Sequence, residues 1–242
     1  MNKIHTQTDD VVAAMRKNGG YATLSVLNQT IDFSGWTTKT PFESVRCILQ
    51  RHPKVFFRIQ PGLWALEECR ESVLSKFRIS SSDKINDEKF THTYYQGLLT
   101  DIGNWKRFDT YIPTQDKNKL YLEKKLGDLT KIDKIPDFTY SQITHRAASI
   151  DVIWFNERKL PHSFYEVEHT TNIINSLNKF YELQDFRATF YIVANTSRRN
   201  EFNSKIEQSI YNPIRPFVKF LSYDELAHQH SKMSEMLSYS FI

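Results

Sequence analysis

Two short apolar runs that each contain acidic residues constrain the fold of this chain more than any other feature. The run SIDVIWF holds Asp151, and the run FYEVEH holds Glu166 and Glu168. Runs this apolar are typical of strands buried on both faces. Successive side chains alternate along a strand, so Glu166 and Glu168 point to the same face. Asp151 lies fifteen residues before Glu166, and a hairpin across that gap would bring the three carboxylates together.

A carboxylate inside a buried strand needs a compensating charge. Mg²⁺ prefers hard oxygen ligands and typically takes one or two carboxylates together with water and substrate phosphate. The cluster therefore suits metal-assisted hydrolysis of phosphodiester bonds. The competing interpretation is an amphipathic strand with an acidic outer face, and the residues alone leave both open.

From about His92 to its end, the chain resembles the PD-(D/E)XK nuclease superfamily, which has the restriction-endonuclease-like fold. The blocks that carry the resemblance are IDVIWF, FYEVEHTT with the helix through Asn178 and Lys179, TFYIVAN and SRRNEF. The resemblance implies that Asp151 and Glu166 hold Mg²⁺, for which Mn²⁺ can substitute, with the main-chain carbonyl of Val167 as a third ligand.

One position departs from the family pattern. Glu168 stands where the family usually has lysine, and it is expected to act as a general base on the attacking water. Lys179 on the next helix is expected to supply the missing positive charge. Arg198 and Arg199 are further candidates for offsetting charge or contacting DNA. Gln96 is the nearest candidate on the first helix for the acidic residue that the fold often places there.

The N-terminal segment, about residues 1–70, predicts three helices followed by a hairpin. TDDVVAAMRKNGG reads as a helix capped by Thr8 or Asp9, a short helix follows around 24–29, and PFESVRCILQRH reads as a third helix with Pro41 at its first position. VFFRIQPGLWAL predicts a hairpin with its turn at 60–62.

These N-terminal blocks resemble the HARE-type winged helix-turn-helix module, which implies binding to double-stranded DNA. Protein contacts are the alternative use of such a module. The third helix is expected to read bases while flanking cations bind phosphate. The candidate DNA-binding residues in this segment are Lys39, Ser44, Arg46, Gln50, Arg51 and Arg58.

Composition adds few constraints. The chain has 242 residues with 40% hydrophobic content, which is enough to build a core, and its net charge of +4 does not by itself indicate a nucleic-acid binder. Its two cysteines lack metal-ligand spacing. No secretory signal or membrane-length apolar run is apparent, so a cytoplasmic protein without membrane association is expected. His228 and His230 are assigned to an exposed tail.

The expected fold class is α/β, with a winged helix-turn-helix domain over 1–70, a linker over 71–90 and a nuclease domain over 91–242 built on a mixed sheet flanked by helices. The expected function is a Mg²⁺-dependent restriction-type DNA endonuclease, with sensing of modified cytosine left open. The alternatives are a DNA-binding regulator with a decayed nuclease domain, and a nuclease specific for RNA or for nucleic-acid structure. Because one site cuts one strand, a homodimer is expected, with aromatic segments near Tyr94 and Tyr95 or at 239–242 as interface candidates.

Overall fold

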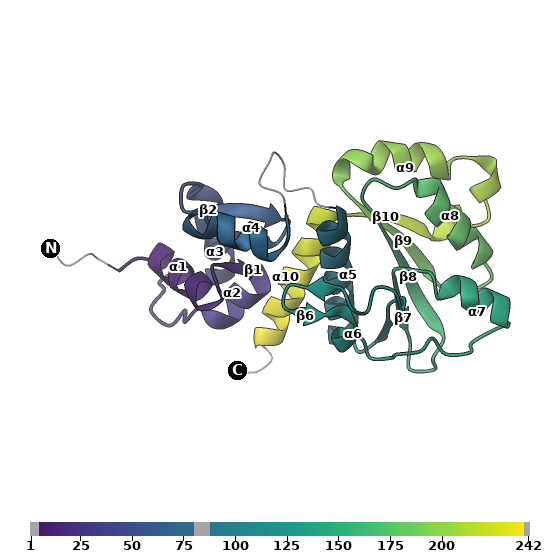
Figure 1. Cartoon of the computed structure of the whole chain (residues 1–242), viewed down its shortest axis with the longest axis horizontal. Helices are drawn as coiled ribbons and strands as arrows, with labels where there is room; N and C mark the ends of the chain where they lie inside the picture. Colours follow the sequence, from purple (N-terminus) through teal and green to yellow (C-terminus); the bar gives the residue numbers. More distant parts are fainter. Residues whose placement is uncertain (1–4, 80–87, 240–242) are drawn as a thin grey trace. The chain divides into compact units, whose positions relative to one another are not determined.

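The computed structural model describes residues 5–79 and 88–239 and divides the chain into two compact units (Figure 1). One unit comprises Met1–Asp87 together with Ala227–Ile242, and the other comprises Glu88–Leu226. Part of the expected linker forms the helix α4 (Arg70–Lys76), which buries Val73 and Leu74. Residues 80–87 of that linker lie outside the described part of the chain.

The first unit follows the order expected from the sequence. Its elements are α1 (Gln7–Lys17), β1 (Tyr21–Thr23), α2 (Leu24–Thr30), α3 (Pro41–Arg51), β2 (Phe56–Gln60), β3 (Leu63–Leu66), the 3₁₀ turn η1 (Glu67–Cys69) and α4. Strand β3 lies between β1 and β2 and is antiparallel to both. The expected hairpin is β2–β3, and Gly62 permits its turn because its φ of 83° lies in the left-handed region.

The first helix begins earlier than its sequence suggests. Thr6 is the N-cap, its hydroxyl accepts from the amide of Asp9, and the Asp9 carboxylate accepts from the amide of Thr6. This reciprocal capping box satisfies two otherwise unpaired backbone donors, so Thr6 rather than Thr8 or Asp9 caps the helix. Helix α3 does begin with Pro41, and it buries Phe42 and Leu49 in the core of the unit.

The C-terminal segment forms a helix. Helix α10 (Tyr223–Tyr239) continues into the first unit, where Ser25 donates a 2.7 Å hydrogen bond to Ser234. His228 is exposed but His230 is buried, so the expectation of an exposed tail is wrong. The residues after Leu226 cluster with the first unit and not with the expected nuclease domain.

The second unit is built on a mixed five-stranded sheet. Its strands are β4 (Asp109–Tyr111), β7 (Val152–Phe155), β8 (Pro161–Glu168), β9 (Thr189–Ala194) and β10 (Val218–Ser222), in the spatial order β10-β9-β8-β7-β4. The pairs β10–β9 and β9–β8 are parallel, whereas β8–β7 and β7–β4 are antiparallel. The mixed α/β architecture expected from the sequence is confirmed.

Helices cover both faces of this sheet (Figure 1). The main core lies between the sheet and the helices α7 (Ser141–Ala147), α8 (Ile173–Glu182) and α9 (Arg199–Ile206). Helix α5 (Glu88–Trp105) packs against β4, β7 and β8 on the other face. Gly103 permits that approach, since a Cβ there would lie 2.6 Å from the Trp154 indole nitrogen.

Smaller elements complete the second unit. They are β5 (Leu120–Tyr121), β6 (Lys124–Lys125), α6 (Leu126–Leu129) and the 3₁₀ turns η2 (Thr196–Arg198), η3 (Ser209–Tyr211) and η4 (Arg215–Phe217). Tyr94 and Tyr95 are buried inside α5, so they are not the exposed interface expected from the sequence. Among the described residues, no helix has the length and apolar character needed to cross a bilayer.

Candidate active site

The predicted carboxylates meet where the start of β7 lies beside the end of β8. Strands β7 and β8 are antiparallel, with Val152 opposite Tyr165, so the start of β7 lies beside the end of β8. Asp151 immediately precedes β7, and its Oδ2 accepts a 2.7 Å hydrogen bond from the amide of Val167. This bond fixes Asp151 beside the segment that carries Glu166 and Glu168.

A cavity of about 290 Å³ opens at this place. The sheet contributes the three carboxylates and Val167, and α8 contributes its inward side. Helix α5 contributes residues of its first turns, and the loop between β8 and α8 completes the wall. The lining residues are Glu88, His92, Asp151, Glu166, Val167, Glu168, His169, Thr171, Asn175, Ser176 and Lys179.

Lys179 reaches this cavity from α8. Its Nζ lies 2.9 Å from both carboxylate oxygens of Glu166 and donates to the main-chain oxygen of Ser149 at 3.1 Å. Burial and the nearby negative charge of Asp151 together raise the pKa of Glu166 to about 8, against the opposing effect of Lys179. The structure therefore brings together Asp151, Glu166 and Lys179, as the sequence predicts.

Glu168 does not face solvent. It is buried, and it hydrogen-bonds to the hydroxyls of Ser176 and Thr171. Burial raises the pKa of Glu168, and the Ser176 hydrogen bond opposes that rise. Ser176 Oγ also lies 3.0 Å from Glu166 Oε2, so this buried hydroxyl, which the sequence analysis did not single out, joins the two carboxylates.

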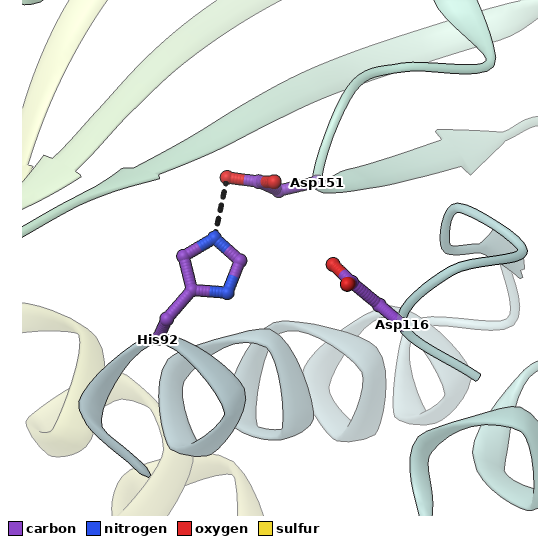
Figure 2. Close-up of side chains that lie close together, drawn as sticks. All are labelled: His92, Asp116 and Asp151. Atoms are coloured by element: carbon purple, nitrogen blue, oxygen red, sulfur yellow. Dashed lines mark ion pairs between the residues drawn. The ribbon is translucent and has the colours of Figure 1, made fainter. Parts of the chain in front are cut away.

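A second cluster involves residues that the sequence analysis missed (Figure 2). One ligand atom each of His92, Asp116 and Asp151 can be chosen so that all three lie within 4.8 Å of one another. His92 Nε2 lies 3.1 Å from Asp151 Oδ2. Gln96, which the sequence does point to, donates to Asp116 Oδ2 at 2.8 Å and to the main-chain oxygen of Asp151 at 3.3 Å. His92 precedes Gln96 by four residues on the same helix face, which is the one sequence signal that points to it.

Two polar atoms of this cluster are buried without a hydrogen-bond partner. They are Nδ1 of His92 and Oε1 of Gln96, and Gln96 is completely buried. A buried polar atom without a partner typically costs about 1–3 kcal/mol. Buried groups of this kind are usually satisfied by an ordered water or a bound ion.

The predicted DNA-binding residues of the first unit differ in their surroundings. Lys39, Gln50, Arg51 and Arg58 are exposed. Ser44 is half-buried and donates to Thr38 Oγ1 at 3.2 Å and to the main-chain oxygen of Thr40 at 3.1 Å.

Arg46 is held by acidic and hydroxyl groups instead of facing solvent. Its side chain is 14% exposed, and it donates to Ser231 at 2.7 Å and pairs with Glu235 and with Glu43. Arg46 therefore joins α3 to α10 within the first unit, and its guanidinium group is occupied by these contacts.

The two arginines of the second unit are also engaged. Arg198 donates to the main-chain oxygens of His169 and Thr171, at 3.2 and 2.6 Å, and pairs with Glu201. Arg199 pairs with Glu225 at 3.2 Å. Arg198 thus fixes the loop that closes the cavity beside Glu168, which places it as a positioning residue for that loop.

Comparison with known proteins gives an independent result. Residues 73–241, well over half of the chain, match the family described as the type II restriction enzyme NmeDI C-terminal domain. The type II restriction enzyme NmeDI of Neisseria meningitidis serogroup C is 34% identical over 104 residues, which cover 41% of this chain and 30% of that enzyme. No solved structure matches the chain. The resemblance to restriction-type enzymes is confirmed at this level, and the chain belongs to the NmeDI C-terminal domain family of type II restriction enzymes.

Proposed function

We propose that this chain is a restriction-type endonuclease of the PD-(D/E)XK kind, which hydrolyses phosphodiester bonds of duplex DNA with Mg²⁺, or with Mn²⁺ in its place. The observation that carries the proposal is the meeting of Asp151, Glu166 and Lys179 in one cavity at the joined ends of β7 and β8. The lysine comes from α8, while the strand position that usually holds it carries Glu168.

The donor set of this cavity fits a divalent cation. Asp151 and Glu166 offer carboxylate oxygens and Val167 offers its main-chain carbonyl, which are the hard ligands that Mg²⁺ prefers. The raised pKa of Glu166 reflects negative charge gathered in a buried place, which a cation there would relieve. When bound, the cation would polarise the scissile phosphate and lower the pKa of a bound water.

The protein's own groups then have separate roles. Lys179, paired with Glu166 at 2.9 Å, holds that carboxylate in place and provides positive charge for the phosphate of the transition state. Glu168 accepts a proton from the attacking water as general base, and burial raises its pKa above the ordinary value of a glutamate. Ser176 fixes the relative positions of Glu166 and Glu168.

The first unit is proposed to bind DNA as a winged helix-turn-helix module. Its element order, three helices with β1 between the first two and a hairpin after the third, supports this assignment. The exposed side of α3 carries Gln50 and Arg51 toward bases, and Lys39 and Arg58 flank it as phosphate contacts. Arg46 is left out of this set because α10 holds it.

Digestion of methylated and unmethylated plasmid DNA in Mg²⁺, with a chelator control, tests the proposal. Wild-type protein is expected to cut, and Asp151→Asn and Glu166→Gln are expected to bind the same DNA without cutting it. Sequencing of the ends would give the site, and a difference between the two plasmids would show sensitivity to modified cytosine.

Two results would contradict the proposal. Specific binding of duplex DNA without cleavage in Mg²⁺ or Mn²⁺ would indicate a DNA-binding regulator with a decayed site. Cleavage of structured RNA in preference to duplex DNA would indicate a nuclease of a different substrate class.

A further inference from the structure

We propose that His92, Asp116 and Asp151 form a second cation site, distinct from the Asp151–Glu166 site, that binds a transition-metal ion such as Mn²⁺ or Co²⁺. The inference goes beyond the proposed function and shares Asp151 with it. Figure 2 shows the three side chains converging from α5, from the loop after β4 and from the residue before β7.

The first argument is the convergence itself. The three ligand atoms come from positions far apart in the sequence and lie within 4.8 Å of one another. His92 and Asp151 both line the cavity, which gives an ion a route to the cluster, and Asp116 is buried behind them.

The second argument is independent of the carboxylates. Gln96 is completely buried, and its amide nitrogen bonds to both Asp116 and the main chain of Asp151. Its amide oxygen, carried by the same group, is buried and has no hydrogen-bond partner, and neither has His92 Nδ1. Two buried polar atoms, one on a member of the cluster and one on the glutamine bound to it, therefore have no partner, and a bound ion or its water would satisfy the imidazole nitrogen.

The donor chemistry distinguishes the two sites. The Asp151–Glu166 site offers oxygen only, which suits Mg²⁺. The second site adds an imidazole nitrogen, which favours Mn²⁺, Co²⁺ or Zn²⁺ over Mg²⁺. The charged group that pairs with the cluster from outside it is Lys119, whose Nζ lies 2.6 Å from Asp116 Oδ1. Lys119 engages one oxygen of Asp116, and Gln96 engages the other through a neutral amide.

The test is pulsed electron paramagnetic resonance of the full chain with Mn²⁺ alone, which detects a ¹⁴N nucleus bonded to the ion. Wild-type protein is expected to show ¹⁴N coupling that His92→Gln removes. Glu166→Gln, which disables only the oxygen site, is expected to keep the coupling. His145→Gln is the matched control because His145 is exposed on α7.

Affinity gives a second measurement. Asp116→Asn is expected to weaken Mn²⁺ binding in the Glu166→Gln background by at least about 10-fold, because loss of even an outer-shell partner typically costs about 10–100-fold. Mn²⁺ binding without ¹⁴N coupling would overturn this proposal alone and leave His92 as a hydrogen-bond partner of Asp151. Absence of any Mn²⁺ or Mg²⁺ binding by folded wild-type protein would overturn the proposed nuclease site as well.

Discussion

In the proposed PD-(D/E)XK site, Lys179 supplies from a helix the positive charge that the superfamily usually carries on the strand. A lysine at position 168 would enter the site from the strand that also carries Glu166. Lys179 enters from the helix after that strand, and its ammonium group still lies 2.9 Å from Glu166. The long flexible stem of lysine makes this exchange feasible.

Replacing Lys179 tests whether its charge is needed for catalysis. Lys179→Met keeps the length and the apolar stem but removes the ammonium group, so cleavage is expected to fall by about 10²–10³-fold, the typical cost of losing one transition-state contact. DNA binding is expected to change little. Lys219→Met, at an exposed lysine on β10, is the control, and plasmid cleavage rates provide the measurement.

A double variant separates charge from position. In Lys179→Met with Glu168→Lys, a lysine stands at its usual place in the strand, but the proposed general base is lost, so activity is expected to stay at least as low as in Lys179→Met. Recovery of activity, together with unchanged folding by circular dichroism, would show that charge at the phosphate is the requirement and that Glu168 is not the base.

Glu166 predicts a pH dependence of stability in metal-free protein. Its pKa rises from an ordinary value of 4.5 to about 8 on folding, chiefly because it is buried. Between these values the folded state holds a proton that the unfolded state has released, so stability falls as pH rises through this window. The slope for one such group is at most about 1.4 kcal/mol per pH unit.

Urea denaturation in chelator checks this dependence. The difference in unfolding free energy between wild type and Glu166→Gln is expected to shift against wild type from about pH 5 to about pH 8, with Glu166 as the cause. A difference that stays constant across that range would show that the folded-state pKa of Glu166 is not raised.

The sequence predicts site residues best where an acidic side chain interrupts an apolar run. Asp151 and Glu166 are found because a carboxylate in an apolar strand is conspicuous. Lys179 is found through family likeness. His92 and Asp116 are missed because one is a lone histidine on a helix and the other a loop acid, and only the packing of α5 and that loop near β7 brings them within reach of Asp151.

Helix α3 has two different sides. One side carries exposed Gln50 and Arg51, and the other carries Arg46 into a cluster with Ser231 and Glu235 of α10. The sequence gives all three as DNA contacts because it shows only that they share a basic helix. Contacts with residues 227–239 of α10 engage Arg46, whereas Gln50 and Arg51 stay exposed to solvent.

Substitutions on the two sides are therefore expected to have different effects. Arg46→Met leaves buried Glu235 with Lys232, at 3.0 Å, and the Ser231 hydroxyl, at 3.3 Å, and is expected to destabilise the first unit by about 1–3 kcal/mol. Arg51→Met is expected to leave stability unchanged and to weaken DNA binding, most strongly at low salt. Thermal denaturation and a gel-shift series at several salt concentrations measure the two effects. Equal loss of DNA affinity in both variants at full stability would contradict this division.

Elements with strong local signals are the ones the sequence predicts. The apolar runs give β7, β8 and β9, and Pro41 marks the start of α3. Helices α4 and α10 were not foreseen as part of the first unit, since their sequences are mixed in charge and their apolar positions acquire a partner only in the folded unit. Val73 and Leu74 in α4 are examples.

At the scale of the whole molecule, the presence of one proposed cleavage site per chain predicts the oligomeric state. Within residues 5–79 and 88–239, one cavity combines the Asp151–Glu166 pair with Lys179, and under the proposed function one such site would cut one strand. Duplex DNA has pseudo-two-fold symmetry, and two-fold dimers are the commonest oligomers. A homodimer on DNA is therefore expected, and light scattering with and without cognate duplex measures it. A one-to-one complex that only nicks DNA would identify a nickase instead.

The placement of α10 has a consequence for the order in which the protein matures. A ribosome makes residues 88–226 before residues 227–239, yet the latter supply the partners of Arg46 and Ser25 in the first unit. During synthesis, the sheet-containing unit can therefore assemble while the first unit still lacks the part of α10 that packs against it. The first unit, which we propose binds DNA, completes its packing only once residues 227–239 have left the ribosome.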